Sequence, residues 1–412
     1  MLFSVDELDA VLACAVALVV AYVATPVSGL IARRIGAVDQ PSERGLADRP
    51  TPRLGGLALL AGILVAAIVF VPMETQTKGV LAGAIAVTAV GALDDVYDLP
   101  PAVKLLGQIG AALIPVLSDV RVETFTLPFV GRVDLGHLAG PVSVLWIVGV
   151  VNAVNLTDGI DGLAAGVCAI SAIAFAVIAF DLGRPTAGVL AAIIAGSALG
   201  FLFHNFHPAA VFMGDAGSNV LGFMLAATAI QGTLKTNAVI ALLFPLIILA
   251  VPFLDTSFVV AKRLKHRRPV YRADASHFHH RLSNIGFSQR RVVLYLYAWT
   301  MTMAGLAVAL RFVPYSDDAG HLNEGWALVM GGLGLVTLAA SVYLVYVLEI
   351  LKFRRVRAWQ LRRLRPDTSE MEIEEQVARE LDTGEFEALG GVPEPRAGGR
   401  DHGTGEVPAV RS

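Results

Sequence analysis

The stretch 11-VLACAVALVVAYVATPVSGLI-31 decides the fold class. It contains no charged residue, and its length matches the ~20 apolar residues with which a helix crosses the hydrocarbon core of a membrane. Asp6, Glu7 and Asp9 precede it, whereas a secretory signal peptide opens with a basic region and ends at a cleavage site of small residues. We therefore expect this segment to stay in the mature protein as a transmembrane helix.

Similar apolar stretches recur along most of the chain. Hydrophobic residues make up 55% of the sequence and charged residues only 16%, so lipid is the expected solvent for much of it. The pattern predicts an all-α polytopic membrane protein with about eleven transmembrane helices. The expected segments are Val11–Ile31, Leu54–Val71, Val80–Leu93, Val103–Leu117, Val142–Leu156, Leu163–Phe180, Ala187–Phe203, Asn219–Gln231, Asn237–Ala261, Val292–Leu310 and Trp326–Leu351.

The distribution of basic residues predicts the orientation. Lysine and arginine gather in the first loop (Arg33–Arg53), in the loop before the tenth segment (Lys262–Arg291) and after the last segment (Lys352–Arg365). Basic residues in short loops favour the cytoplasmic side. With eleven spans all three regions fall on that side, so we expect the amino terminus outside and the carboxyl terminus in the cytoplasm.

Composition also suggests three parts of the chain. Residues 1–351 are expected to form the transmembrane domain, and residues 352–366 a basic juxtamembrane segment. The tail, 367–412, holds twelve acidic residues and four arginines, a composition that resists packing, so we expect disorder with one short helix near Glu370–Leu381. In an outer loop, Ser118–Gly140 alternates in a way that predicts a small hairpin without a catalytic role.

Carboxylates end the third segment. The motif GALDDVYDLP places Asp94, Asp95 and Asp98 where the chain should leave the membrane on the cytoplasmic side. Adjacent carboxylates repel each other, so they are best tolerated in water or beside a cation such as Mg²⁺. An acidic loop cap is the alternative interpretation.

Amides and carboxylates also lie between the fifth and sixth segments. The motif NAVNLTDGIDGLAAG spaces Asn152, Asn155, Asp158 and Asp161 three residues apart, which would bring them toward one helical face. Such groups suit hydrogen bonding to a nucleobase or a ribose. For an isolated motif of this kind, a turn cap remains the alternative.

The junction before the eighth segment reads HNFHPAAVFMGDAGSN. Asp215 stands between glycines at the start of a hydrophobic helix, where backbone N–H groups are exposed to an anion, and it is a candidate ligand for a hard cation. Ser218 is interpreted as the N-cap of that helix. His204 and His207 are interpreted as interfacial or structural residues rather than metal ligands.

Two further sites carry positive charge. The basic loop contains ADASHFHHRL, whose imidazoles and guanidinium could hold phosphate oxygens. No cysteine supports a zinc site there, and the surrounding charge disfavours a dication. Arg53 of PTPRLGG and Lys104 could neutralise phosphate or anchor the chain at the interface. The candidate residues of the loop are His277, His279, His280 and Arg281.

The one-sided placement of these motifs is more informative than any of them alone. Four of the five interior junctions before the tenth segment carry Asp, Asn or His clusters. This predicts a shared site at the cytoplasmic interface for substrates rich in phosphate. A secondary transporter is the alternative of a different class, and its polar residues should instead lie near the bilayer midplane in broken helices.

Together the motifs resemble those of the polyprenyl-phosphate N-acetylhexosamine-1-phosphate transferases. The motifs that carry the resemblance lie between about Asp39 and Arg291 and follow one another in the family's order. Within the family, the chain most resembles the branch that starts O-antigen, teichoic-acid or arabinogalactan linkers. It implies transfer of sugar-1-phosphate from UDP-N-acetylglucosamine, or a related UDP-N-acetylhexosamine, to polyprenyl phosphate with release of UMP. The murein-precursor translocases are the nearest rival, but they usually carry TPTMGG where this chain has PTPRLGG.

The resemblance also implies a cofactor, partners and a location. The reaction would need Mg²⁺, with Mn²⁺ as an alternative, at a cytoplasm-facing site of a multi-pass protein in the bacterial inner membrane. The expected partners are the sugar nucleotide, polyprenyl phosphate and membrane lipids, with no nucleic acid; a homodimer is left open. A one-step displacement is the favoured mechanism, and a covalent aspartyl intermediate is the alternative.

Individual roles follow from the resemblance. Asp215 looks like the magnesium ligand, with Asn155 beside it, and Asp94 like the carboxylate that positions or deprotonates the acceptor phosphate, supported by Asp95. Lys104 resembles a pyrophosphate contact. The nucleoside-pocket positions would be Asn152, Asn155, Asp158, Asp161 and Phe212, and the HxHH stretch with Arg281 would serve the sugar or phosphate end. The chain departs from the family at 45-GLAD-48, where many relatives have a Lys-Val-His run.

Overall fold

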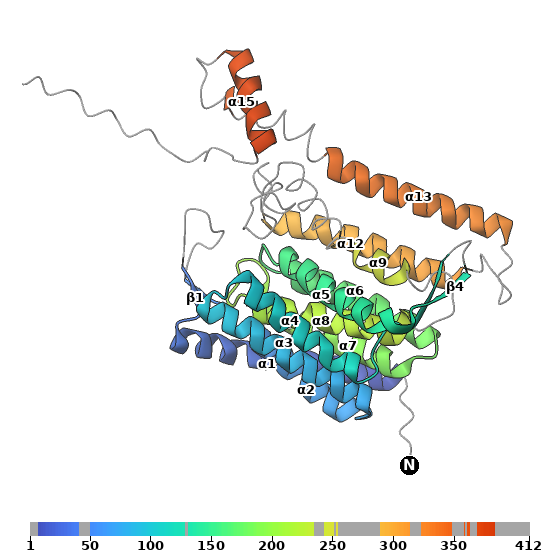
Figure 1. The fold of residues 1–412 in the computed structure, drawn as a ribbon. Coiled ribbons are helices and arrows are strands. Elements are labelled where there is room, and N and C mark those ends of the chain that lie inside the picture. The colour runs from blue at the N-terminus through green and yellow to red at the C-terminus, as the bar shows by residue number, and fades with distance from the viewer. Residues whose placement is uncertain are drawn as a thin grey trace, which may run out of the picture. The chain divides into compact units, whose positions relative to one another are not determined.

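A computed structural model describes residues 7–40, 50–127, 131–234, 243–250, 253, 289–313, 323–347, 358, 361–362 and 369–383. The chain divides into two compact units, Met1–Phe353 and Arg354–Ser412. The first unit is a bundle of helices (Figure 1). Its elements are α1 (Glu7–Ile35), α2 (Gly55–Phe70), α3 (Thr75–Tyr97), α4 (Pro101–Leu117), α5 (Ala139–Thr157), α6 (Leu163–Asp181), α7 (Pro185–Asn205), α8 (Gly214–Ala229) with a π-helical extension (Ile230–Leu234), α9 (Leu243–Ile248), α12 (Gln289–Phe312) and α13 (Glu324–Val347).

The helices follow the apolar stretches of the sequence. Each of the first eight expected segments coincides with one of α1 to α8, and the tenth and eleventh with α12 and α13. Of the ninth, Asn237–Ala261, the described part forms only α9 and a few flanking residues. Seven of the described helices are long and apolar enough to cross a membrane, while α2 and α4 are shorter apolar helices. The chain is therefore a helical polytopic membrane protein; the count of eleven and the orientation stay predictions.

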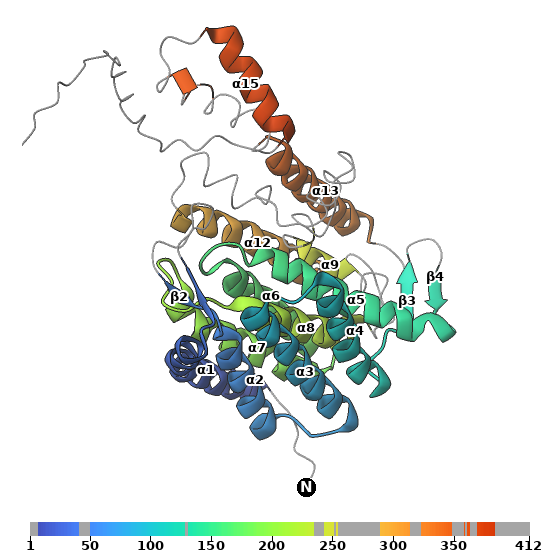
Figure 2. The ribbon, with the colours of Figure 1, turned by 60° about the vertical axis from the view of Figure 1, so that its left-hand side comes forward.

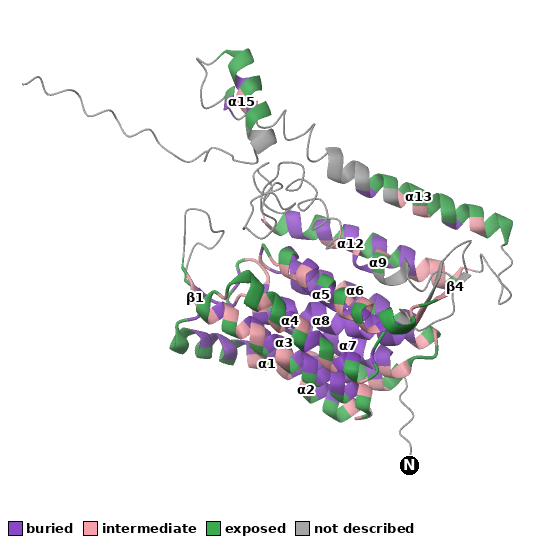
Figure 3. Cartoon of the chain, in the orientation of Figure 1, coloured by how far each residue is buried: buried purple, intermediate pink, exposed green. Residues whose placement is uncertain are grey.

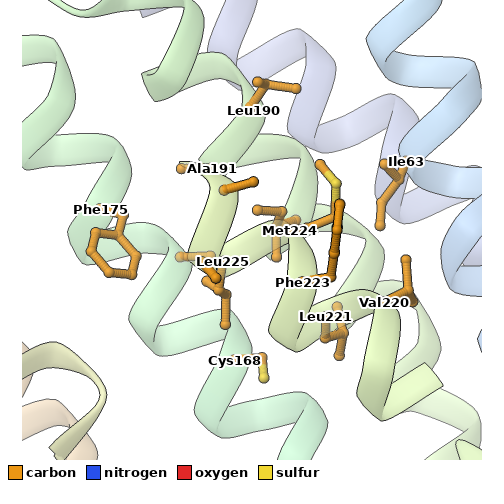
Figure 4. Close-up of a cluster of buried hydrophobic side chains, with 14 of the residues drawn as sticks. Ile63, Cys168, Phe175, Leu190, Ala191, Val220, Leu221, Phe223, Met224 and Leu225 are labelled. Carbon is orange, nitrogen blue, oxygen red and sulfur yellow. The ribbon is translucent and has the colours of Figure 1, made fainter. Parts of the chain in front are cut away.

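The core surrounds α8, whose residues from Ala216 to Ala229 are all buried (Figure 3). Figure 4 shows Phe223, Met224 and Leu225 of α8 among side chains of α2, α6 and α7. Small residues allow close packing elsewhere: a Cβ at Gly200 of α7 would collide with the backbone of Leu18 in α1. Large exposed apolar side chains on α1 and α13 suit contact with lipid.

Two small antiparallel sheets accompany the helices. The predicted hairpin is confirmed as β3 (Thr124–Leu127) paired with β4 (Gly131–Asp134). A second pair, β1 (Val38–Asp39) with β2 (Thr51–Pro52), was not expected from the sequence. The two sheets lie at opposite ends of the bundle in both views (Figures 1 and 2).

Tight turns at the β1–β2 end set the positions of the polar motifs. α3 ends at Tyr97, its C-cap Asp98 adopts the left-handed conformation with φ 48°, and α4 starts with Pro101 directly after Pro100. Gly214, with φ 67°, starts α8. The carboxyl ends of α3 and α5 and the amino ends of α4 and α8 thus bring their side chains together.

The second unit contains α15 (Glu370–Thr383), close to the short helix predicted at Glu370–Leu381. Its start is a capping box: the Glu372 N–H donates to Ser369 Oγ at 3.3 Å, and the Ser369 N–H donates to Glu372 Oε2 at 3.2 Å. Ile373 and Val377 pack with Leu361. The rest of the acidic tail lies outside the described residues, and its expected disorder stays a prediction.

Candidate active site

Lys104 joins two of the predicted carboxylates. Its Nζ lies 3.0 Å from Asp94 Oδ2 and also contacts Asp215 Oδ2, so α3, α4 and α8 meet at one ammonium group. The three side chains are between 14% and 26% exposed, which reduces solvent screening while leaving an opening to the site. Two carboxylates this close together repel each other unless a cation lies between them. Lys104 supplies that charge.

Asn155 holds the other oxygen of Asp215. Its Nδ2 donates to Asp215 Oδ1 at 2.8 Å and to Ser218 Oγ at 2.9 Å. The amide nitrogen, not the amide oxygen, therefore faces the carboxylate, and in this arrangement Asn155 positions Asp215 rather than offering an oxygen ligand beside it.

Asp95 caps the start of α8. Its two carboxylate oxygens accept the backbone N–H groups of Asp215 at 2.9 Å and Ala216 at 3.1 Å, and its side chain is buried. Helix amino ends leave such donors unpaired, and a carboxylate there is also stabilised by the helix dipole. The N-cap interpretation of Ser218 is wrong, because α8 begins at Gly214 and the Ser218 hydroxyl donates to the Gly214 carbonyl at 3.2 Å. The cap comes from α3 instead.

Arg53 and Phe212 lie in two loops that lock together. The Phe212 N–H donates to the Pro52 carbonyl at 2.8 Å, and the Gly55 N–H donates to the Phe212 carbonyl at 3.0 Å. Arg53 Nε donates to the Asp95 carbonyl at 3.2 Å, and its guanidinium lies 3.5 Å from Asp98. Arg53 thus braces the end of α3, and the backbone of the half-buried Phe212 is bonded to the residues on either side of Arg53 and Leu54.

Asp161 fastens the loop after α7. Its Oδ2 accepts the Ala209 N–H at 3.0 Å and lies 2.8 Å from His207 Nδ1. Asn205 adds to this junction, since its Oδ1 accepts the Gly162 N–H and its Nδ2 donates to the Val211 carbonyl, each at 3.0 Å. Asp161 therefore acts mainly by holding the loop after α7 in place.

Asp158 is the C-cap residue of α5 and lies in the same connection. Burial, with smaller contributions from Asp95 and Asp161, raises the pKa of its carboxyl group to about 7. Near neutral pH this group can both donate and accept a hydrogen bond, which suits a nucleobase edge or a ribose hydroxyl.

The histidines divide into two sets. His204 Nε2 lies 3.1 Å from the Tyr22 carbonyl, and its ring packs on the Tyr22 ring, so its structural interpretation is confirmed, as is that of His207 beside Asp161. His277, His279, His280 and Arg281 lie outside the described residues, and their roles stay predictions.

Several residues at the site were not singled out from the sequence. Asn152, which was, donates to Gln108 Oε1 at 2.8 Å, and Gln108 was missed although it is a lone amide in an apolar helix. The Tyr297 hydroxyl of α12 donates to the Gly162 carbonyl at 2.5 Å and steadies the α5–α6 connection. No local sequence pattern marks Tyr297, because its partner lies far away in the chain.

The donor set fits a magnesium ion. Mg²⁺ usually binds one or two protein carboxylates and completes its shell with water and substrate phosphates. Asp94 and Asp215 supply two carboxylates that already face one cationic group. Among the described residues no group of three or more His, Cys, Asp or Glu side chains is placed to hold a metal ion, so water and substrate phosphates would supply the other ligands. Mn²⁺ favours the same oxygen ligands.

Comparison with known proteins places this site in a family. Residues 77–233 match the model of glycosyl transferase family 4, a range that includes Asp94, Lys104 and Asp215. A protein of Bacillus subtilis, named "Probable undecaprenyl-phosphate N-acetylglucosaminyl 1-phosphate transferase", is 40% identical over 303 residues, which cover 73% of this chain and 85% of the relative. The chain belongs to glycosyl transferase family 4.

Other relatives show where in glycosyl transferase family 4 the similarity is greatest. A "Decaprenyl-phosphate N-acetylglucosaminephosphotransferase" of Mycobacterium leprae is 37% identical over 78% of this chain and 88% of its own length. A "Phospho-N-acetylmuramoyl-pentapeptide-transferase" of Desulforudis audaxviator is 36% identical over 65% of this chain and 86% of its own length. The similarity to the N-acetylglucosamine enzymes therefore extends over more of the chain.

Proposed function

We propose that the protein transfers N-acetylglucosamine-1-phosphate from UDP-N-acetylglucosamine to a polyprenyl phosphate and releases UMP. The observation that carries this proposal is the contact of Lys104 with both Asp94 and Asp215, at the meeting point of three helices. The names of two similar relatives supply the polyprenyl phosphate and the N-acetylglucosamine phosphate group.

The surroundings of the site suit one polar and one lipid substrate. Leu93, Val103 and Leu106, which neighbour Asp94 and Lys104 in sequence, are 50%, 50% and 68% exposed. Such apolar surface can accept a prenyl chain from the bilayer and bring its phosphate to the carboxylates. On the other side, Asp158 and the half-buried Phe212 offer hydrogen bonding and an aromatic face to the nucleoside.

In the reaction, an oxygen of the acceptor phosphate attacks the β-phosphorus of the donor, and the bond from that phosphorus to the UMP oxygen breaks. Lys104 binds phosphate oxygens, and Asp94 orients the acceptor and takes its proton where one is present. A phosphate of this type is largely ionised near neutral pH, so orientation is the larger part of the role of Asp94. Asn155 and Asp95 hold Asp215 in place. A bound Mg²⁺, held by Asp215 and Asp94, would neutralise charge on the diphosphate.

The proposal extends to the setting of the site. We place it on the cytoplasmic face of a bacterial cell membrane, in a domain of residues 1–351 with eleven spans, followed by the basic segment 352–366 and the acidic tail 367–412. The basic loops support this orientation. Asp94, Lys104 and Asp215 lie within the last or first turns of their helices, which favours a site at the membrane interface over a transporter site at the midplane.

The test is an assay of purified protein with labelled donor, polyprenyl phosphate and Mg²⁺. We expect lipid-linked N-acetylglucosamine from the wild type and at least about a thousandfold loss with Asp215→Asn or Asp94→Asn, because each removes a charge from the reacting group. Glu74→Gln is the matched control: it makes the same chemical change at the exposed opposite end of α3 and should leave activity unchanged.

The same assay with different UDP-sugar donors identifies the donor. Product from UDP-N-acetylmuramoyl-pentapeptide but not from UDP-N-acetylglucosamine would replace the proposed donor with that of the other relatives. No lipid product from any UDP-N-acetylhexosamine would refute the transferase proposal.

A further inference from the structure

Two buried amides and one half-buried amide form a second polar layer in the bundle. Asn152 Nδ2 donates to Gln108 Oε1 at 2.8 Å, and Gln108 Nε2 donates to Asn219 Oδ1 at 3.4 Å. Gln108 is 1% exposed and Asn219 is fully buried. Polar groups are costly inside apolar helices unless they are paired, so this chain of contacts needs an explanation.

We define the amide layer as Gln108, Asn152 and Asn219. It lies one helical turn deeper in the bundle than Lys104, Asn155 and Asp215, which we call the charged layer, and it repeats their arrangement. Lys104 and Gln108 are four residues apart on α4, and Asp215 and Asn219 are four apart on α8. On α5, which runs the opposite way, Asn152 precedes Asn155 by three residues. Residues three or four apart share one face of a helix, so the same three helices supply both layers.

The bond of Asn152 to its own helix determines which group donates and which accepts in each hydrogen bond of the amide layer. Asn152 Nδ2 also donates to the Val148 carbonyl of its own helix at 2.8 Å, so the amide must present its nitrogen on that side. Gln108 then has to offer its oxygen to Asn152 and its nitrogen to Asn219. Each amide can take only one orientation, and the layer accepts only one arrangement of α4, α5 and α8.

We propose that the amide layer is a positioning device that fixes the register of α4, α5 and α8, and through it the meeting of Lys104, Asn155 and Asp215, a role that rests on the proposed function. The hydrogen-bond chain adds direction to the register that side-chain packing sets, because a shift of one helix along another would break it. Amides also add no charge. A carboxylate at any of the three positions would compete with Asp94 and Asp215 for the Lys104 ammonium group.

The layer has one unpaired end. Asn219 Nδ2 is buried and has no partner among the described residues. A buried donor without a partner lowers stability, so retaining an amide here costs the fold something that a leucine would not. That cost is expected of a residue kept for position rather than for stability.

The experiment separates position from stability. Gln108→Met removes the printed partner of Asn219 and one of the two partners of Asn152, and should lower both thermal stability and turnover. The triple variant Gln108→Met, Asn152→Leu and Asn219→Leu removes every polar group of the layer, so its melting temperature should return to that of the wild type or above. Its kcat should stay about 10- to 100-fold low because the reacting groups are displaced, whereas loss of Asn152 from the expected nucleoside pocket would raise only KM for the sugar nucleotide.

Thr228→Val is the control. Thr228 is a buried residue of α8 with an unpartnered hydroxyl, but it lies far along the helix from Asp215, and its replacement should raise or preserve stability with full activity. A triple variant that recovers both stability and wild-type kcat would overturn the proposal while leaving the proposed function intact. A wild type without lipid product would overturn both.

Discussion

The contact between Asp95 and α8 allows a quantitative prediction. Asp95→Asn keeps the size of the side chain but leaves one oxygen for two backbone donors, and turns an NH₂ group toward the other. Hydrogen bonds to a charged acceptor contribute about 1.5–3 kcal/mol each, and the helix dipole adds a few tenths. Both bonds have ordinary lengths, 2.9 and 3.1 Å, and Asp95 is buried, so we expect a loss of about 2–4 kcal/mol of stability.

The assay is thermal unfolding in detergent together with kinetics. At about 2–4 °C per kcal/mol, the melting temperature of Asp95→Asn should fall by about 4–16 °C. Turnover should fall as well, since Asp215 is displaced. Gly214→Ala should disrupt the same contact, because the added Cβ would collide with the Asp95 carboxylate. It should therefore also lower both the melting temperature and turnover. Unchanged stability of Asp95→Asn with a selective loss of kcat would refute the capping role and return Asp95 to the chemistry itself.

Three further predictions concern charge, pH and packing. Lys104→Met should abolish lipid product and also destabilise the protein, because it leaves Asp94 and Asp215 facing each other; wild-type turnover in this variant would contradict the role of the ammonium group. The pKa of Asp158 is raised from 3.8 to about 7, so its contribution to stability is present at low pH and is lost as pH rises through about 7. Between about pH 5 and pH 8 the melting temperature of the wild type should therefore fall more than that of Asp158→Asn, and parallel profiles would count against the shift. Gly200→Val should prevent close packing of α7 on α1 and reduce the yield of folded protein, whereas Gly305→Ala, in open space on α12, should not.

Many helices of the bundle could be predicted from the sequence, because an apolar stretch of about 20 residues indicates a helix that crosses a membrane. The apolar stretch at Val103–Leu117 predicted α4 almost residue for residue. The ends were less predictable, since α8 starts at Gly214, several residues before the apolar run at Asn219. There the helix is set by a cap from another part of the chain, which no local pattern records.

The same limit applies to the site. Asp94 and Asp215 were identified from carboxylate motifs at the ends of apolar segments, and Lys104 from the family resemblance. The structure brings these three together. Their adjacency in sequence suggested similar roles for Asp94 and Asp95, but their side chains contact different partners. Gln108 was overlooked because a single amide in an apolar helix has no meaning until its partners on α5 and α8 are known.

The central claim is that this site transfers a sugar together with its phosphate. Donor labelled with ³²P at the β-phosphate, incubated with the wild type, polyprenyl phosphate and Mg²⁺, tests it most directly. We predict that the label enters the lipid fraction in equal amount to the UMP released, and that Lys104→Met prevents both. Sugar reaching the lipid while the β-phosphate stays in the aqueous fraction as UDP would contradict the account.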